Sequence, residues 1–219
     1  MALNNLPDIY FIRHGETDWN AQGRYQGRQD IPLNARGRGQ ADANGPLLRG
    51  LLERDQLIAD DFSWFVSPLL RTRETMDRVR SAFEPTLVKA EIDERLIEIS
   101  FGKFEGYLQR DLVKDGIIKQ GERDAEFWHY RPEGGENYEQ VANRIRPFVT
   151  SLEKPSVVVA HGGIARVFRH VIEGISHAEA VNWPTPQNTV LHFSGGKMTM
   201  YESEVSSGGG VFSSSSSTA

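Results

Sequence analysis

The chain contains no cysteine among its 219 residues. This absence excludes disulfides, thiolate nucleophiles, iron–sulfur clusters and zinc sites built from cysteine. Positive charge is also in deficit, because 25 Lys and Arg residues oppose 30 Asp and Glu residues and the formal net charge is −5 at pH 7. Binding to nucleic acid or to an anionic membrane surface requires clustered positive charge. The composition therefore predicts neither a nucleic-acid partner nor a membrane partner.

Long apolar runs are missing as well. No segment approaches the about 20 apolar residues that cross a bilayer. Residues 1–8 (MALNNLPD) lack the basic start and apolar stretch of a signal peptide, which predicts a cytoplasmic protein. The Gly-x-Ser-x-Gly elbow, the Gly-x-x-x-x-Gly-Lys-Ser/Thr loop and the His-Glu-x-x-His motif are absent too. These absences argue against serine-hydrolase, nucleotide-binding and zinc-hydrolase sites.

Apolar, β-branched runs alternate with amphipathic stretches along the chain, and these patterns predict strands and helices respectively. The predicted strands are 9–12, 62–66, 156–160 and a terminal hairpin of 190–193 and 198–201, with a short extended piece that begins at Leu87-Val88. One predicted helix begins near residue 35. The others span 70–83, 138–152 and 164–172, and short helices are predicted within 107–130. This alternation predicts an α/β fold, a three-layer α/β/α sandwich with a mostly parallel central sheet.

Two segments depart from this regular pattern. The helix predicted after Asn34 carries several glycines and Pro46, so we expect it to be imperfect or interrupted. Residues 206–219 are rich in Ser and Gly and carry no charge. Such a segment cannot bury enough apolar surface to offset the entropy that it loses on ordering. We therefore predict a single domain over residues 1–205 and a flexible tail over 206–219.

Imidazole and guanidinium groups follow three of the predicted strands. Arg13 and His14 come directly after the first strand. Arg71 follows the second strand, and His161 follows the strand at 156–160. Ligand sites of parallel sheets collect at the carboxyl ends of the strands, and Arg binds a tetrahedral oxyanion bidentately. These positions predict a phosphate pocket. The other four histidines are expected to be structural: His129, His170, His177 and His192.

Six motifs follow one another between residues 9 and 193. They are FIRHGET at 11–17, a loop formed by Asn20 and residues 24–33, SPLLRT at 67–72, LIEISFGKFEG at 96–106, PEGGE at 132–136 and AHGG at 160–163. In this order they resemble the histidine phosphatase superfamily, whose best-known members are the cofactor-dependent phosphoglycerate mutases. The resemblance implies a phosphoglycerate mutase-like fold and an enzyme that transfers phosphoryl groups.

The resemblance also implies a role for each matching residue. His14 would be the nucleophile and would carry a phosphohistidine intermediate. Arg13 and Arg71 would hold the phosphoryl oxygens, and His161 would donate a further hydrogen bond to them. Glu98 would be the general acid for the leaving alkoxide and then the base for water. The remaining phosphate or substrate contacts would come from Asn20, Gln26, Gly27 and Gly162.

Elementary chemistry supports His14 as the nucleophile but does not identify the general acid. An attacking imidazole must be neutral, and two neighbouring arginines lower its pKa because like charges disfavour the imidazolium. Arginines and histidines can neutralise a phosphoryl group without a metal or cofactor, so we expect neither. From the residues alone, the acid could be Glu98 or any of the nearby carboxylates Glu91, Asp93, Glu94 and Glu105. The family pattern selects Glu98.

A phosphatase and a mutase share this chemistry and differ in what accepts the phosphoryl group. The segment between Glu98 and His161 is short for the mutases, and residues 106–161 contain no adjacent Arg-Arg pair that could clamp a bisphosphorylated cofactor. We therefore predict the phosphatase branch, with water as acceptor and a small phosphorylated metabolite as substrate. A phosphoglycerate mutase and a noncatalytic phosphate-binding module are the alternatives. We expect a monomer or a homodimer.

Overall fold

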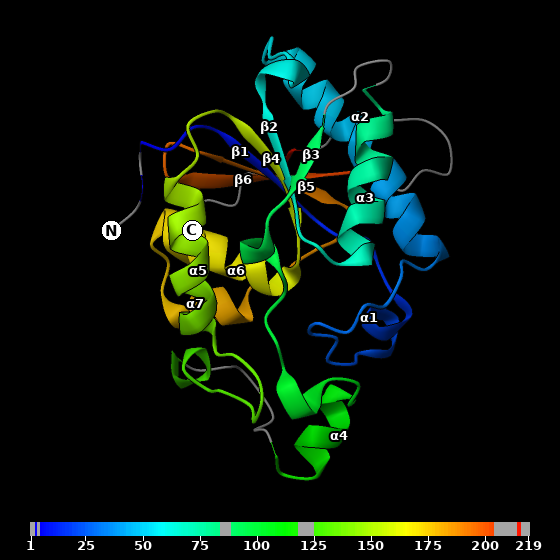
Figure 1. Cartoon of the computed structure of the whole chain (residues 1–219), viewed down its shortest axis with the longest axis vertical. Helices are drawn as coiled ribbons and strands as arrows, with labels where there is room; N and C mark the ends of the chain where they lie inside the picture. The colour runs from blue at the N-terminus through cyan, green and yellow to red at the C-terminus, as the bar shows by residue number, and fades with distance from the viewer. Residues whose placement is uncertain (1–2, 4, 84–88, 118–124, 204–213, 216–219) are drawn as a thin grey trace.

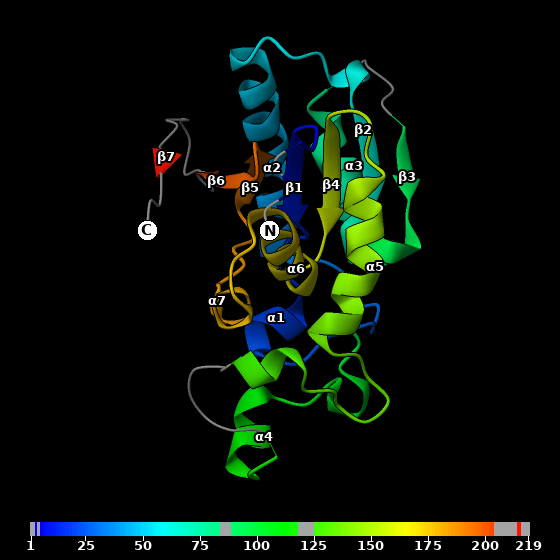
Figure 2. The same ribbon diagram turned by 90° about the vertical axis from the view of Figure 1, so that its left-hand side faces the viewer.

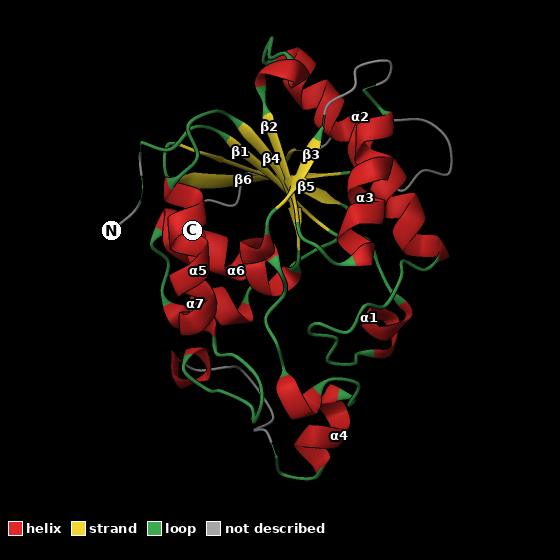
Figure 3. Cartoon of the chain, in the orientation of Figure 1, coloured by secondary structure: helices red, strands yellow, loops and turns green. Residues whose placement is uncertain are grey.

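The computed structural model of the chain describes residues 3, 5–83, 89–117, 125–203 and 214–215. Its central element is one sheet with the strand order β3-β2-β4-β1-β5-β6-β7. Helices cover both faces of this sheet (Figure 1 and Figure 3). The strands are β1 (Ile9–Arg13), β2 (Ser63–Val66), β3 (Ala90–Ile92), β4 (Ser156–Ala160), β5 (Thr189–Ser194), β6 (Lys197–Glu202) and β7 (Ser214–Ser215).

Strands β1 to β4 run parallel to one another and position the site. Arg13 at the end of β1 lies opposite Ala160 at the end of β4. Val66 at the end of β2 lies opposite Val159 of the same strand β4. The residues that follow these three strands therefore leave the sheet side by side at one edge. Strand β5 pairs with β1 in the antiparallel sense and begins the predicted terminal hairpin with β6.

The helices form a layer on each face of the sheet, which confirms the predicted three-layer sandwich. The bounds of the layer helices are Ala35–Arg54 (α2) and Leu70–Ser81 (α3) on one face, and Tyr138–Thr150 (α5), Gly162–Glu173 (α6) and His177–Asn182 (α7) on the other. Figure 2 shows α5 and α6 in front of the central strands and α2 behind them. Alternate residues of β1 pack against the two helix layers. Tyr10 and Ile12 pack with α2 and α3. Ile9 and Phe11 pack with α5 and α6.

Helix α2 is continuous, so the expected interruption is wrong. Asn34 caps its first turn by accepting a hydrogen bond from the backbone N–H of Gly37 at 2.8 Å. A Cβ atom at Gly37 would lie 2.0 Å from the carbonyl oxygen of Glu16, and one at Gly45 would lie 2.9 Å from that of Val79. These glycines permit close approach of neighbouring backbone, which outweighs their lower helix propensity.

Shorter elements extend beyond the carboxyl edge of the parallel strands, where α1 and α4 lie below the sheet in both views (Figure 1 and Figure 2). The remaining elements are α1 (Asp18–Gln22), α4 (Gln109–Lys114), η1 (Ala59–Asp61), η2 (Glu94–Leu96), η3 (Gly102–Phe104) and η4 (Ala125–Trp128). None of the described helices is both long and apolar enough to cross a membrane. The predicted extended piece at Leu87-Val88 lies outside the described residues, as does the predicted tail 206–219 except for β7.

Candidate functional site

A cleft of about 660 Å³ opens at the carboxyl edge of the parallel strands. It collects eight of the nine residues that the sequence nominates for the site. These are Arg13, His14, Asn20, Gln26, Gly27, Arg71, Glu98 and Gly162. The ninth residue, His161, packs edge-on against His14 with 5.2 Å between the ring centroids. The structure therefore brings all nine together.

His14, directly after β1, is a buried neutral imidazole. Its Nδ1 lies 2.7 Å from the carbonyl oxygen of Gly15, and its Nε2 lies 3.3 Å from Nε of Arg71. A carbonyl only accepts and a guanidinium only donates, so Nδ1 carries the proton and Nε2 carries the lone pair. Burial, followed by the charges of Arg71 and Arg13, holds the pKa of His14 well below its ordinary value. Nε2 is the nitrogen available as a nucleophile.

Arg71, in the first turn of α3, is fully buried beside this ring. Its two terminal nitrogens donate to the carbonyl oxygens of Gln29 at 2.7 Å and Gly27 at 2.8 Å. The Gln26 amide is satisfied when its oxygen accepts from Nε of Arg71 at 2.7 Å and its nitrogen donates to Thr17 Oγ1 at 2.5 Å. Burial lowers the pKa of Arg71 to about 10, which leaves the side chain charged at neutral pH. The loop after α1 thus fixes a permanent cation against His14.

Arg13 provides the second cation, from the end of β1. Its Nη1 donates to the carbonyl oxygen and to Oγ1 of Thr185, whereas its buried Nε has no partner within the described part of the chain. Burial lowers the pKa of Arg13 to about 10 and again leaves it charged. A Cβ atom at Gly162 would lie 3.3 Å from Nε of Arg13 and 2.7 Å from Thr185 Oγ1. The glycine keeps the space beside this unpaired donor open for an oxyanion.

His161 precedes α6 as its N-cap residue and is fully buried. Its Nε2 lies 2.6 Å from Oγ of Ser67, and its Nδ1 has no partner among the described residues. Burial is the main cause that holds the pKa of His161 well below its ordinary value, and the charge of Arg71 adds to it. The second histidine is therefore neutral as well and can supply one hydrogen bond beside His14.

Glu98 lies in the irregular segment between η2 and η3, and its carboxylate is held by two backbone donors. Its oxygens accept hydrogen bonds from the N–H groups of Ile99 at 2.9 Å and Gly163 at 3.2 Å. The alternative acids differ in position. Glu105 accepts from the backbone of Arg28 at 3.1 Å and holds the neighbouring loop, and Glu94 is exposed. Of these three carboxylates, Glu98 is the one that lines the cleft.

Arg166 and Thr185 are site residues that sequence reasoning missed. Both line the cleft, and Arg166 donates from Nε to the carbonyl oxygen of Trp183 at 3.2 Å. Arg166 follows Gly162 by one helical turn, so the helical period after the AHGG motif could have identified it. Thr185 lies in the loop between α7 and β5, where no local pattern marks it. No cluster of three His, Asp or Glu residues in the described ranges is arranged to hold a metal ion.

Known proteins resemble the chain along most of its length. The family model of the histidine phosphatase superfamily (branch 1) matches residues 9–204. Phosphoserine phosphatase 1 of Hydrogenobacter thermophilus is 31% identical over 163 residues, which cover 70% of each chain. A 2,3-bisphosphoglycerate-dependent phosphoglycerate mutase of Rhizobium etli is 27% identical, over 84% of this chain and 90% of the mutase. The structure of a mycobacterial glucosyl-3-phosphoglycerate phosphatase matches with a TM-score of 0.70 at 25% identity, over 86% of this chain and 90% of that one.

Proposed function

Since the chain belongs to the histidine phosphatase superfamily, whose members among its relatives are phosphatases or phosphoglycerate mutases, we propose that it hydrolyses a small phosphorylated metabolite. The acceptor is water, because the segment between Glu98 and His161 is short and lacks an Arg-Arg pair for a bisphosphorylated cofactor. The reaction needs no metal and passes through a phosphohistidine at His14.

The observation that carries this proposal is the neutral imidazole of His14 beside the buried guanidinium of Arg71 and the partly buried guanidinium of Arg13. Its Nε2 attacks phosphorus, so that an N–P bond forms while the ester P–O bond breaks. Arg13 and Arg71 neutralise the oxygens of the transferring group, where most of the charge of the transition state resides. Two displacements through a covalent intermediate replace one difficult displacement by water.

Glu98 moves the proton in both half-reactions. A phosphate dianion beside it favours the protonated carboxyl, since a second negative charge nearby is disfavoured. The carboxyl gives its proton to the departing alkoxide. The carboxylate then takes a proton from a water molecule whose oxygen bonds to phosphorus as the N–P bond breaks, so that inorganic phosphate is released and His14 is neutral again.

The Glu98→Gln variant should lose activity in proportion to the basicity of the leaving group. For an alkyl phosphate we expect kcat/KM to fall by roughly 10²- to 10⁴-fold, the range typical of a lost general acid. p-Nitrophenyl phosphate should be affected far less, because nitrophenolate leaves without protonation. Steady-state kinetics on both esters measure the difference, with Glu94→Gln as the matched exposed control. Equal losses on the two esters would contradict the acid role.

The Gly163→Ala variant tests the placement of the same carboxyl without changing it. A Cβ atom at Gly163 would lie 2.5 Å from Oε1 of Glu98 and 2.8 Å from Cγ2 of Ile99. The carboxyl must move, and we expect a loss of kcat/KM of about 10-fold or more for an alkyl phosphate, since proton transfer requires hydrogen-bond reach. Gly39→Ala in α2, where nothing lies within 4 Å of the added Cβ atom, is the control. Unchanged alkyl phosphate hydrolysis in Gly163→Ala would show that Glu98 does not need this position.

The alternative functions are separated by three assays on the wild-type protein. Hydrolysis of p-nitrophenyl phosphate should be unaffected by a chelator, whereas a metal-dependent enzyme would lose activity. A noncatalytic phosphate-binding module would show no turnover. Conversion of 3-phosphoglycerate to its isomer, dependent on added bisphosphoglycerate and faster than phosphate release, would identify a mutase and overturn the proposed hydrolysis. A wider panel of phosphomonoesters ranked by kcat/KM would define the substrate.

A further inference from the structure

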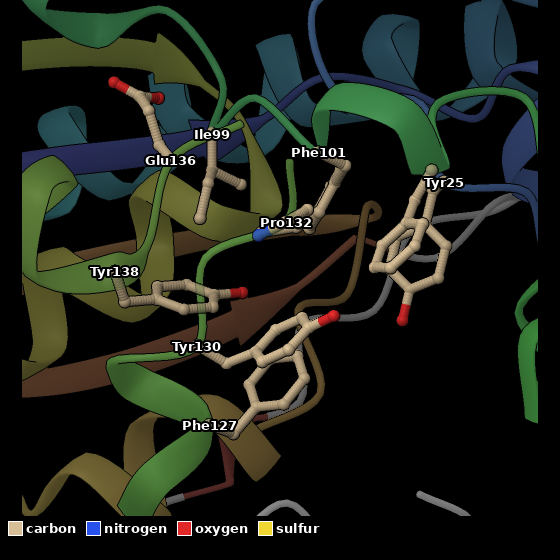
Figure 4. A pocket seen from close by; sticks show the side chains of 9 residues that line it. Tyr25, Ile99, Phe101, Phe127, Tyr130, Pro132, Glu136 and Tyr138 are labelled. Carbon is tan, nitrogen blue, oxygen red and sulfur yellow. The ribbon is translucent and has the colours of Figure 1, made fainter. Parts of the chain in front are cut away.

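Glu136 lies in the Gly-rich loop before α5, and three donor groups contact one of its carboxylate oxygens. Its Oε2 lies 2.9 Å from Nη2 of Arg28 and 3.3 Å from Nη2 of Arg144. The same oxygen accepts a hydrogen bond from the backbone N–H of Ser100 at 3.1 Å. Figure 4 shows this carboxylate directed away from the aromatic side chains, such as Tyr130, that line the small pocket beside it. Its partners are therefore the two arginines and the backbone N–H of Ser100.

Both arginines also reach the backbone of Glu98. Nε of Arg28 and Nη2 of Arg144 each lie 3.3 Å from the carbonyl oxygen of Glu98. Arg144, from α5, also donates through Nη1 to the carbonyl oxygen of Arg95, so it holds the segment at two points. Residues 97–101 lie between η2 and η3 in no helix or strand, and the backbone N–H of Glu136 donates to the carbonyl oxygen of Ser100 at 2.8 Å. The contacts of Arg28 and Arg144 add a second point of attachment, at the carbonyl oxygen of Glu98.

The negative charge of Glu136 is what makes this arrangement stable. Arg144 is mostly buried, and burial lowers its pKa while Glu136 opposes that shift. A buried cation that loses its counter-ion is strongly destabilised, so Arg144 depends on this carboxylate. Arg28 lies between Gly27 and Gln29, the residues whose carbonyl oxygens hold Arg71. Glu105 holds this loop independently of Glu136, because it accepts hydrogen bonds from the backbone N–H of Arg28 at 3.1 Å and from Nε2 of Gln29 at 3.0 Å.

We propose that Glu136 is a positioning residue that fixes Arg28 and Arg144 and thereby holds the Glu98 carboxyl at the leaving oxygen. This inference rests on the proposed phosphatase chemistry. Glu136 does not line the catalytic cleft and acts through the backbone of the segment that carries Glu98, at the carbonyl oxygen of Glu98 and the N–H of Ser100. When Glu136 is lost, kcat/KM should therefore fall most for substrates whose leaving group needs a proton. Phosphate binding should be unchanged.

The test is the Glu136→Gln variant, which keeps the shape and an acceptor oxygen but removes the charge. We expect kcat/KM for an alkyl phosphate to fall by more than about 10-fold, because small misplacements of catalytic groups have large effects on rate. The value for p-nitrophenyl phosphate should stay within about 3-fold of wild type, since its leaving group needs little protonation. Arg28→Gln, which leaves no buried charge behind, should show the same selectivity. Glu133→Gln is the matched control, since this carboxylate of the same loop pairs with Lys103 at 2.9 Å.

A double variant separates positioning from general destabilisation. In the Glu98→Gln background, Glu136→Gln should cause no further loss on the alkyl phosphate, because the acid that it positions is already absent. Equal losses on both esters, no loss on either, or additive losses in the double variant would overturn the positioning role while wild-type hydrolysis stands. Failure of the wild-type protein to release phosphate from either ester would overturn the proposed function, and the positioning role with it.

Discussion

The His14→Ala variant is expected to lose turnover of every phosphomonoester, by on the order of 10⁴-fold or more, because it has no atom that can accept the phosphoryl group. The fold should persist. The ring lines the cleft, where water can replace it as the partner of the Gly15 carbonyl oxygen and of Arg71. Steady-state kinetics give the loss of kcat, and far-UV circular dichroism with thermal unfolding verifies the fold.

His129→Ala is the matched control for this variant. His129 is an exposed histidine that packs against the ring of His177 and does not line the cleft. We expect its kcat to remain at the wild-type level. Turnover by His14→Ala within about 10-fold of wild type would show that another group is the nucleophile, since loss of a covalent nucleophile is never so mild.

The Arg71→Lys variant is expected to reduce kcat/KM by about 10²- to 10³-fold, the effect of removing one preorganised donor from a developing oxyanion. Lysine keeps the charge but has a single ammonium group, which cannot replace a planar guanidinium with five donors. It cannot serve the carbonyl oxygens of Gln29 and Gly27 while it also faces His14. The loop after α1 should loosen as well, at a cost of about 1–3 kcal/mol in the free energy of unfolding for each buried acceptor left unpaired.

Kinetics and urea unfolding measure both effects of this substitution. Arg73→Lys, an exposed residue two positions further along α3, is the control and should change neither quantity. Arg71→Lys with normal kcat/KM would contradict the role of the guanidinium fork. A loss of stability without a loss of kcat/KM would show that the role of Arg71 is structural and not catalytic.

The layered fold could be predicted because its central strands β1 and β4 are buried on both faces. Every residue of β4 is buried, and such a continuous apolar run is a strong local signal. Helices α1 and α7 were not predicted, since each has six residues or fewer and carries little hydrophobic periodicity. Their capping boxes, which begin at Thr17 and Ser176, were the remaining signals. The continuity of α2 depends on the backbone that packs against Gly37 and Gly45, which no local pattern contains.

The site could be predicted where it follows strands and known motifs. The membership of the chain in the superfamily is confirmed by the match over residues 9–204. The roles of the individual residues stay predictions until the variants are measured, although the structure brings the side chains together. The clamp formed by Arg28, Glu136 and Arg144 joins three segments that are distant in the chain, around residues 28, 98 and 136–144. Only the folded structure shows that two of these side chains meet at the carbonyl oxygen of Glu98.

The most direct test of the central claim is to trap the phosphorylated protein. In Glu98→Gln, p-nitrophenyl phosphate can still phosphorylate the imidazole, but water is no longer activated, so the intermediate should accumulate. When the ester is labelled at phosphorus, we expect the protein to carry the label at Nε2 of His14. This label should be stable in alkali and lost in acid. The same treatment of His14→Ala should leave the protein unlabelled. Two results would contradict a covalent route through His14. One is label on any other residue, and the other is phosphate release by Glu98→Gln without any label on the protein.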